Sequence, residues 1–332
     1  MPTIGKIRFL VIIFFLSLNL FISRTWAAED NHVLNLNPLT GVLIGRSEEF
    51  LFKYKNSDQY VSELLWDLKP LFYLGLGLEY CPGKPFERDS FFAAGSVKIG
   101  LPLKTGIMED RDWDNKYEDY LTKYSRHDAF SQNAILADIS AGYSWYLGDK
   151  FVLGAFGEFS YMYYSWMAEN GYYQYAKSNE EWDDSIPKIN IYGPAIRYAQ
   201  NWFILSPGMF MKIKLSDNFL LEGNFRYSPL IFCADRDDHL FQDEFGEGQL
   251  FFGYFYFGHY IDGGARLIYS PVTNLDLSLS LSYRYITGMR DKTYYATTGA
   301  GASGHTFENY EGGAGFSALD INLAVKIRVF GF

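Results

Sequence analysis

The segment Asn274-Leu-Asp-Leu-Ser-Leu-Ser-Leu-Ser-Tyr-Arg-Tyr285 decides the fold, because apolar and polar residues alternate along it without a break. The apolar and aromatic set consists of Leu275, Leu277, Leu279, Leu281, Tyr283 and Tyr285. The polar set consists of Asp276, Ser278, Ser280, Ser282 and Arg284. A period of two is that of a β-strand, whose successive side chains point to opposite faces. The segment therefore predicts a strand with one apolar and one polar face.

The C-terminal stretch 319–329 repeats this alternation, and the chain ends in Phe332. A soluble sandwich also alternates, but its strands run about 5 to 6 residues, whereas these run past about 12. Long alternating strands and a terminal aromatic residue are typical of bacterial outer-membrane barrels. The heavy aromatic content, 27 Tyr, 29 Phe and 7 Trp, also fits strands with one face toward lipid and one toward water.

The whole chain then gives ten strands, an even number, as single-chain bacterial barrels require. They are expected near 38–53, 61–80, 90–107, 133–147, 151–169, 194–215, 218–234, 249–270, 274–288 and 316–331. Tight turns are expected at 148–150, 216–218 and 270–274, and long polar loops near 108–132, 170–193, 235–248 and 289–315. The fold class is thus all-β: a ten-stranded antiparallel transmembrane β-barrel with long extracellular loops.

The first residues have the layout of a secretory signal peptide: a basic start, an apolar run over 9–22 and a small-residue end at Ala27. We expect residues 1–27 to be removed and residues 28–332 to form one outer-membrane barrel domain. Because residues 1–27 carry three basic and no acidic residues, their removal lowers the formal net charge from −10 to −13. Such a negative chain disfavours nucleic acid as a partner.

Only two cysteines occur, Cys81 and Cys233. A bridge between them is possible in principle for an exported chain. The strand count, however, places them at opposite ends of the barrel, so we expect no disulfide.

Two acidic clusters fall at the outer ends of strands. Asp110 and Asp112 follow the third strand and continue its inward-facing set, which includes Lys98 and Lys104. The second cluster follows the seventh strand. There Asp235, Asp237 and His239 lie two residues apart and share a face if the chain is extended.

The phase of the seventh strand sends the second cluster to the lipid-facing side, together with Phe225 and Tyr227. Those residues reach the interior only if one extra residue is inserted into the strand. Ser228-Pro229 is a reasonable place for such a bulge, because proline cannot donate to the ladder.

At these residues the chain resembles the omptins, a family of ten-stranded outer-membrane endopeptidases. The segment Asp110-Arg-Asp112-Trp113 resembles the family's Asp-x-Asp-Trp, and Asp237-Asp-His239 resembles its Asp-x-His. Ser125-Arg-His127 matches another recurrent triplet. Three such motifs in the same order on the corresponding loops are more specific than any one of them.

The resemblance implies that His239 and Asp237 form a dyad facing Asp110 and Asp112, with the attacking water between them. Asp237 would orient the imidazole, and neutral His239 would take the proton of the water. Crowded carboxylates raise one another's pKa, so one of the facing pair would hold a proton for the oxyanion. No cofactor and no metal is implied.

Two other chemistries are open to residues of this region. Ser125 and His127 suggest a serine enzyme. Asp110, Asp112 and Asp114 imitate the start of a calcium loop, but Asn115 replaces the glycine and Leu121 stands where a bidentate acid is needed.

The resemblance also implies an acidic pocket for the basic residue before the cut, at Glu49 and Asp235. Glu48 is adjacent to Glu49, and a slip of one residue would reverse its face. The family's lipopolysaccharide site has a Tyr, Glu and Arg at alternate positions of the fifth strand, where this chain has Phe159, Tyr161 and Tyr163. Dependence on lipopolysaccharide is therefore doubtful, although outer-membrane lipid is an expected partner.

Three functions follow for a barrel in the bacterial outer membrane with its site toward the exterior. The favoured one is an endopeptidase that cleaves peptides or proteins next to basic residues. An inactive omptin-like surface adhesin is the alternative, and a small-solute channel comes third, because ten strands leave little lumen once arginines fill it.

Overall fold

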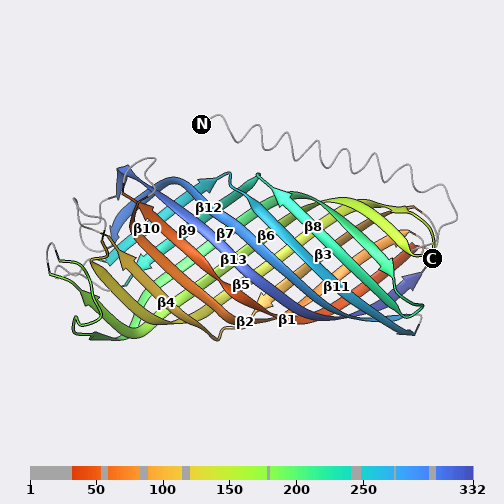
Figure 1. Ribbon diagram of the computed structural model, residues 1–332, viewed down its shortest axis with the longest axis horizontal. Coiled ribbons are helices and arrows are strands. Elements are labelled where there is room, and N and C mark those ends of the chain that lie inside the picture. Colours follow the sequence, from red (N-terminus) through yellow and green to blue (C-terminus); the bar gives the residue numbers. More distant parts are fainter. Residues whose placement is uncertain are drawn as a thin grey trace.

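The computed structural model describes residues 32–53, 59–82, 89–113, 120–177, 180–240, 248–272, 274–298 and 304–331. Thirteen strands, all paired antiparallel, form one sheet that curls into a barrel (Figure 1). They are β1 (His32–Phe52), β2 (Tyr60–Pro82), β3 (Ser90–Gly100), β4 (Lys104–Asp112), β5 (Lys123–Tyr146), β6 (Phe151–Tyr175), β7 (Ile189–Lys214), β8 (Phe219–Ser228), β9 (Ile231–His239), β10 (Gly248–Tyr256), β11 (Tyr260–Val272), β12 (Leu275–Thr298) and β13 (Gly304–Gly331).

Three pairs of these strands, β3 with β4, β8 with β9 and β10 with β11, continue each other along one path in the wall. Thirteen labelled strands therefore make ten staves, and the predicted fold class is confirmed. None of the described residues forms a helix that is long and apolar enough to cross a membrane.

The barrel is closed by the pairing of β1 with β13, which runs from Val33 opposite Gly331 to Phe52 opposite Glu311. Closure leaves no edge strand in the described sheet, so each stave finds backbone partners on both sides. That is the condition for β-structure to span lipid, where an unpaired backbone group costs several kcal/mol.

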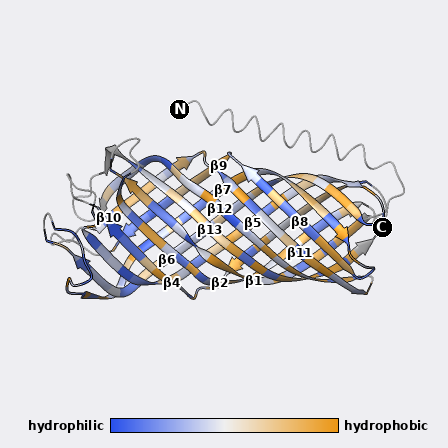
Figure 2. Ribbon diagram, in the orientation of Figure 1, coloured by the Kyte–Doolittle hydropathy of each residue, from blue (hydrophilic) through white to orange (hydrophobic). Residues whose placement is uncertain are grey.

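Most of the exposed apolar side chains lie toward the end that carries the tight turns. Exposed large apolar side chains there include Phe72, Leu74, Leu76, Leu78, Ile135, Ile139, Leu205, Met209, Leu277, Leu279, Leu281 and Leu323. Figure 2 shows hydrophobic and hydrophilic residues alternating along the strands. At the opposite end the outward face carries Arg197, Arg236 and Asp238. The staves of 21 to 28 residues at β1 and β13 exceed the roughly 9 to 11 needed to cross a bilayer, so this end projects beyond the apolar band.

The predicted long loops are wrong in extent, because strands extend into all four of them and occupy most of 108–132 and 289–315. The connections beyond β4, β6, β9 and β12 shrink to 113–122, 176–188, 240–247 and 299–303. Both acidic clusters consequently lie within strands and not on loops. The predicted tight turns after β5, β7 and β11 are confirmed.

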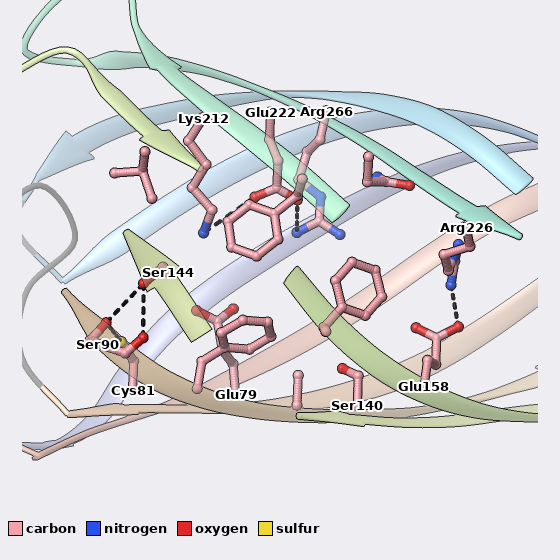
Figure 3. Close-up of a pocket in the computed structure, with 16 residues that line it drawn as sticks. Glu79, Cys81, Ser90, Ser140, Ser144, Glu158, Lys212, Glu222, Arg226 and Arg266 are labelled. Carbon is pink, nitrogen blue, oxygen red and sulfur yellow. Dashed lines mark hydrogen bonds and ion pairs between the residues drawn. The ribbon is translucent and has the colours of Figure 1, made fainter. Parts of the chain in front are cut away.

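The lumen near the tight turns is filled by charged side chains in compensating pairs. Lys98 lies 2.7 Å from Asp320, Lys326 lies 2.8 Å from Glu79, and Lys212 lies 3.4 Å from Glu222. Glu79, Lys212, Glu222 and Cys81 line a cavity of about 220 Å³, and Figure 3 shows these side chains around it. Cys81 and Cys233 are both free, as expected.

Above this cavity a layer of large side chains crosses the lumen, contributed by β2, β6, β7, β11 and β13. Its members are at most 1% exposed: Trp66, Tyr164, Trp166, Tyr198, Trp202, Tyr260 and Phe316. We call these seven residues the aromatic layer. Along β2, Trp66 of this layer lies between Glu79, which lines the cavity, and Leu64, which stands opposite Asp110 of the first acidic cluster.

The expected extra residue between β8 and β9 is present. Five residues along β7, from Ile204 to Gly208, face six residues along the neighbouring stave, from Ile231 back to Arg226. Ser228 holds the bulge, since its Oγ donates to the Leu205 carbonyl at 2.6 Å and accepts from the Leu230 amide at 2.9 Å. The insertion turns the odd-numbered residues of β9 inward.

The shift in register is shared by the strands that follow. β10 and β11 keep a regular register with β9, β8 and β12, and the shift ends between β12 and β13, where β12 has one extra residue between Ile286 and Met289. The prediction that Lys104 faces inward is wrong. Between β3 and β4 the phase changes, and Lys104 points outward, where its Nζ lies 2.7 Å from Asp128 Oδ1. A second irregularity before Gly106 restores the phase, so Asp110 and Asp112 still face inward.

Deleting Pro229 should remove the extra residue and return the odd-numbered residues of β9 to the outer face. The histidine and aspartate that the family resemblance implies as a dyad would then leave the interior, and the peptide cleavage that it implies should fall by roughly 100-fold or more. The barrel should still fold, which its migration in unheated gels would show. Pro229→Gly keeps the residue count and serves as the control, so a deletion variant as active as this control would contradict the prediction.

Candidate active site

A histidine–carboxylate pair lies inside the projecting end, on β9. His239 Nε2 and Asp237 Oδ2 are 2.6 Å apart, and Asp237 is only 2% exposed. Burial lowers the pKa of His239, but Asp237, Asp110 and Asp112 outweigh it and raise that pKa to about 9. The imidazole is therefore coupled to three carboxylates and not to one.

The facing carboxylates come from β4, where Asp110 stands opposite Leu64 of β2 and Ser125 of β5. Burial is the main reason that the pKa of Asp110 lies well above its ordinary value, and Asp112 and Asp237 raise it further. This shift favours the protonated form of the carboxyl, and the protonated form can donate a hydrogen bond.

Glu49 of β1 and Asp235 of β9 lie beside this cluster. Burial raises the pKa of Glu49 well above its ordinary value, and Asp237, Asp235 and Asp110 add to the effect. Glu48 points the other way, with its carboxylate 2.7 Å from Arg46 on the outer face. Of the two neighbouring glutamates, only Glu49 faces the interior acids.

Asp235 has well-defined partners. Tyr198 donates its hydroxyl to Oδ2 at 3.2 Å, and the Gly253 amide donates to Oδ1 at 2.7 Å. Burial raises the pKa of Asp235 to about 7, against the effect of these two bonds. A side chain at Gly253 would meet the Asp235 carboxylate at 2.8 Å, so glycine keeps this acid accessible.

Three carboxylate oxygens of the cluster are buried without a hydrogen-bond partner: Asp110 Oδ1, Asp237 Oδ1 and Glu49 Oε2. Each such group costs about 1–3 kcal/mol. Unpaired buried oxygens do not stabilise the fold. In a binding site, however, they are available to accept hydrogen bonds from a water molecule and a polar substrate. Perturbed carboxylates around one histidine are typical of functional sites.

Ser125 and His127 of β5 lie next to the cluster and are 5% and 3% exposed. His127 donates from Nδ1 to the Asn170 carbonyl at 2.5 Å, and its Nε2 lies 3.1 Å from Ser125 Oγ. Asn170 presents this carbonyl from a left-handed conformation, with φ 56°. Burial lowers the pKa of His127, so the ring is neutral and its Nε2 accepts the serine hydroxyl.

Two features of the site were not visible in the sequence. The ring of Phe251 packs edge-on against His239 at 5.5 Å, and Tyr198 carries the hydrogen bond to Asp235. Their only sequence signal is their inward phase on β10 and β7, which many lumen residues share.

The calcium alternative gains no support from the part of the chain that the structure describes, where no three acids, histidines or cysteines are grouped as metal ligands. Asp114 and Asn115 lie outside the described residues. The signal peptide expected at residues 1–27 lies outside them as well.

Among curated proteins, the plasminogen activator of Yersinia pestis is 26% identical over 227 residues, which cover 65% of this chain and 68% of that protein. Protease 7 of Escherichia coli O157:H7 is 27% identical over 209 residues, covering 62% of this chain and 63% of the relative. The chain thus matches about two thirds of the length of these proteases.

Among solved structures, the outer-membrane protease OmpT of Escherichia coli superposes with a TM-score of 0.76. The match covers 90% of this chain and 97% of that one at 20% sequence identity, which supports the barrel fold. The model of the Omptin family matches residues 30–329, nearly the whole chain, and the chain therefore belongs to this family of outer-membrane proteases.

Proposed function

We propose that this protein is an active endopeptidase of the outer membrane that hydrolyses peptide bonds next to basic residues. The observation that carries the proposal is the convergence of buried, unpaired carboxylate oxygens around His239, with Asp237 2.6 Å from its Nε2. Such an arrangement can activate a water molecule without a covalent nucleophile.

In the proposed reaction, neutral His239 donates its Nε2–H to Asp237 and keeps the lone pair on Nδ1. The water oxygen forms a bond to the scissile carbonyl carbon while its proton passes to His239. The carbon–nitrogen bond then breaks, and His239 returns the proton to the leaving amine. Asp237 stabilises the imidazolium in between.

Asp110 and Asp112 would serve the other side of the carbonyl. A carboxyl that keeps its proton can donate a hydrogen bond to the developing oxyanion, and this interaction strengthens as charge accumulates. The raised pKa of Asp110, caused mainly by burial, supports this role.

Glu49 and Asp235 would select the basic residue before the cut. Both acids are buried beside the dyad, and a guanidinium or ammonium group would donate to Glu49 Oε2, which lacks a partner, and would pair with the Asp235 carboxylate. The substrates would be peptides or proteins that reach the projecting, open end, which we place toward the cell exterior.

Lipopolysaccharide dependence is not part of the proposal. The wall position occupied by Phe159, Tyr161 and Tyr163 offers aromatic side chains and no charge, and the ring of Tyr161 lies 5.1 Å from that of Phe203 at a tilt of 46°. Aromatic residues of this kind favour the lipid interface in general.

The two other functions differ from the protease in observable ways. An inactive adhesin has no reason to keep three unpaired carboxylate oxygens in one cluster. A channel would need an open lumen, whereas the aromatic layer crosses it. A serine mechanism at Ser125 would leave a covalent acyl-enzyme.

The first prediction concerns the dyad. His239→Ala and Asp237→Ala should each lower kcat/KM for a fluorogenic Arg-Arg peptide by roughly 100- to 10,000-fold, because general base catalysis is lost. Refolded protein should be assayed with and without lipopolysaccharide, and we expect similar rates. Labelling of the wild type by a serine-hydrolase probe would favour the Ser125 mechanism, and an inactive wild type would favour the adhesin.

The second prediction concerns pH. Because carboxylates raise the pKa of His239 to about 9, its neutral base form accumulates with rising pH, and kcat/KM should climb through neutral pH. Asp237→Asn removes the largest of these charges, so the ascending limb should move to lower pH while the maximal rate falls. Profiles over pH 5 to 10 would test this, and an unmoved limb would remove His239 from the role of base.

The third prediction concerns selectivity. Glu49→Gln and Asp235→Asn should each weaken kcat/KM for basic peptides by about 10- to 100-fold, the range expected for one charge-assisted hydrogen bond. Glu48→Gln is the matched control, since its side chain pairs with Arg46 on the outer face. Equal losses in Glu48→Gln and Glu49→Gln would contradict the assignment of Glu49.

A further inference from the structure

We propose that Tyr198 determines the specificity of this protein, as the last donor in a one-way hydrogen-bond chain that keeps Asp235 an acceptor for a cationic substrate side chain. The inference rests on the proposed function, because it assumes that Asp235 meets the basic residue before the cut. It adds a residue that belongs to no motif of the sequence, and a reason why the pocket selects charge.

The chain starts at Trp202 of β7. An indole N–H can only donate, and it lies 3.1 Å from Oε1 of Gln200, which must therefore be the amide oxygen. Ser47 of β1 donates its hydroxyl to the same oxygen. The orientation of the Gln200 amide is thus fixed by two donors from different strands.

The nitrogen of Gln200 consequently points the other way. It donates to the Glu48 carbonyl at 3.1 Å, which can only accept, and to Tyr198 Oη at 2.7 Å. Since Oη accepts from Gln200, its own proton is directed to Asp235 Oδ2, 3.2 Å away. Each hydrogen bond in this chain therefore has only one possible donor, and the last acceptor is the Asp235 carboxylate.

Packing holds Tyr198 in this position. Its ring stacks on Trp66, at 5.4 Å and 13°, and on Trp166, at 6.0 Å and 19°, and the two indoles also contact each other at 6.0 Å. Tyr198, Gln200 and Trp202 are all 0% exposed, so water does not compete for these bonds. A buried network in which every member is satisfied specifies one arrangement of its groups.

The surroundings of Asp235 make this donor decisive. Glu49 of β1 and Asp237 and Cys233 of β9 face it, none of them cationic, while Tyr198 of β7 and the Gly253 amide of β10 donate to it. Burial raises the pKa of Asp235 to about 7, and the bond from Tyr198 holds it from rising further. Without that donor the carboxyl would be protonated, and neutral, at physiological pH.

A neutral carboxyl would no longer prefer a cation. A pocket built around a protonated Asp235 would accept methionine or leucine nearly as well as arginine, because the apolar stem of arginine contributes most of its contact area. The selectivity for charge therefore depends on a hydroxyl that the substrate never touches, which makes Tyr198 a positioning residue.

The test compares Tyr198→Phe with Tyr164→Phe. Tyr164 belongs to the same aromatic layer and stacks on Trp166 at 5.5 Å, but its hydroxyl is buried without a partner. Both variants lose one hydroxyl from the layer, and only the first loses a bond to Asp235.

The quantity to measure is the ratio of kcat/KM for two peptides that differ only in arginine or methionine before the cut, between pH 5.5 and 9. We expect Tyr198→Phe to lower this ratio about tenfold at neutral pH and to regain it about one pH unit higher, where Asp235 ionises without help. Tyr164→Phe should keep the wild-type ratio and its pH dependence. An equal, pH-independent loss in both variants would reduce Tyr198 to a packing role and overturn the proposal.

Binding of the same peptides to His239→Ala protein separates this inference from the proposed hydrolysis. A preference for the arginine peptide that weakens with the additional change Tyr198→Phe and recovers at higher pH would support the chain even if the wild type proved inactive. Binding without preference for arginine would overturn the role of Tyr198, and turnover of the wild type would still decide the hydrolase.

Discussion

The pairing of β1 with β13 is the interaction on which the rest of the molecule depends, because a sheet in lipid cannot leave a backbone edge unpaired. Closure fixes which face of every stave is inside. It also forces the interior to be filled, which this chain does with ion pairs near the tight turns and with the aromatic layer above them. The acidic cluster is built on top of that filling, where strands have left the apolar band.

The shift in register across β8 to β12 turns the acidic residues inward while the wall stays closed. Without the extra residue near Ser228, the acids of β9 would line the outer surface and the interior would receive their apolar neighbours. Hydrogen bonds of Ser228 to Leu205 and Leu230 replace those that Pro229 cannot make. A local defect in the ladder thus sets the position of His239 and Asp237.

Much of this was predictable from the sequence where physics leaves a periodic trace. The alternation over 274–285 predicted a barrel strand, and the proline predicted the bulge. The loops were overestimated because both faces of a stave meet water beyond the bilayer, so the alternation fades while the strand continues. Tyr198, Gln200 and Trp202 could not be recognised, since their partner Asp235 lies on another strand and inward-facing aromatic residues are common in any lumen.

The aromatic layer has a consequence for the cell envelope. Trp66, Trp166 and Tyr198 pack against one another across the lumen, so the open end of the barrel leads to a cavity with a closed base. A peptide that enters must leave, whole or in fragments, by the mouth through which it came. Because this layer fills the lumen, the barrel offers no open route from one end to the other.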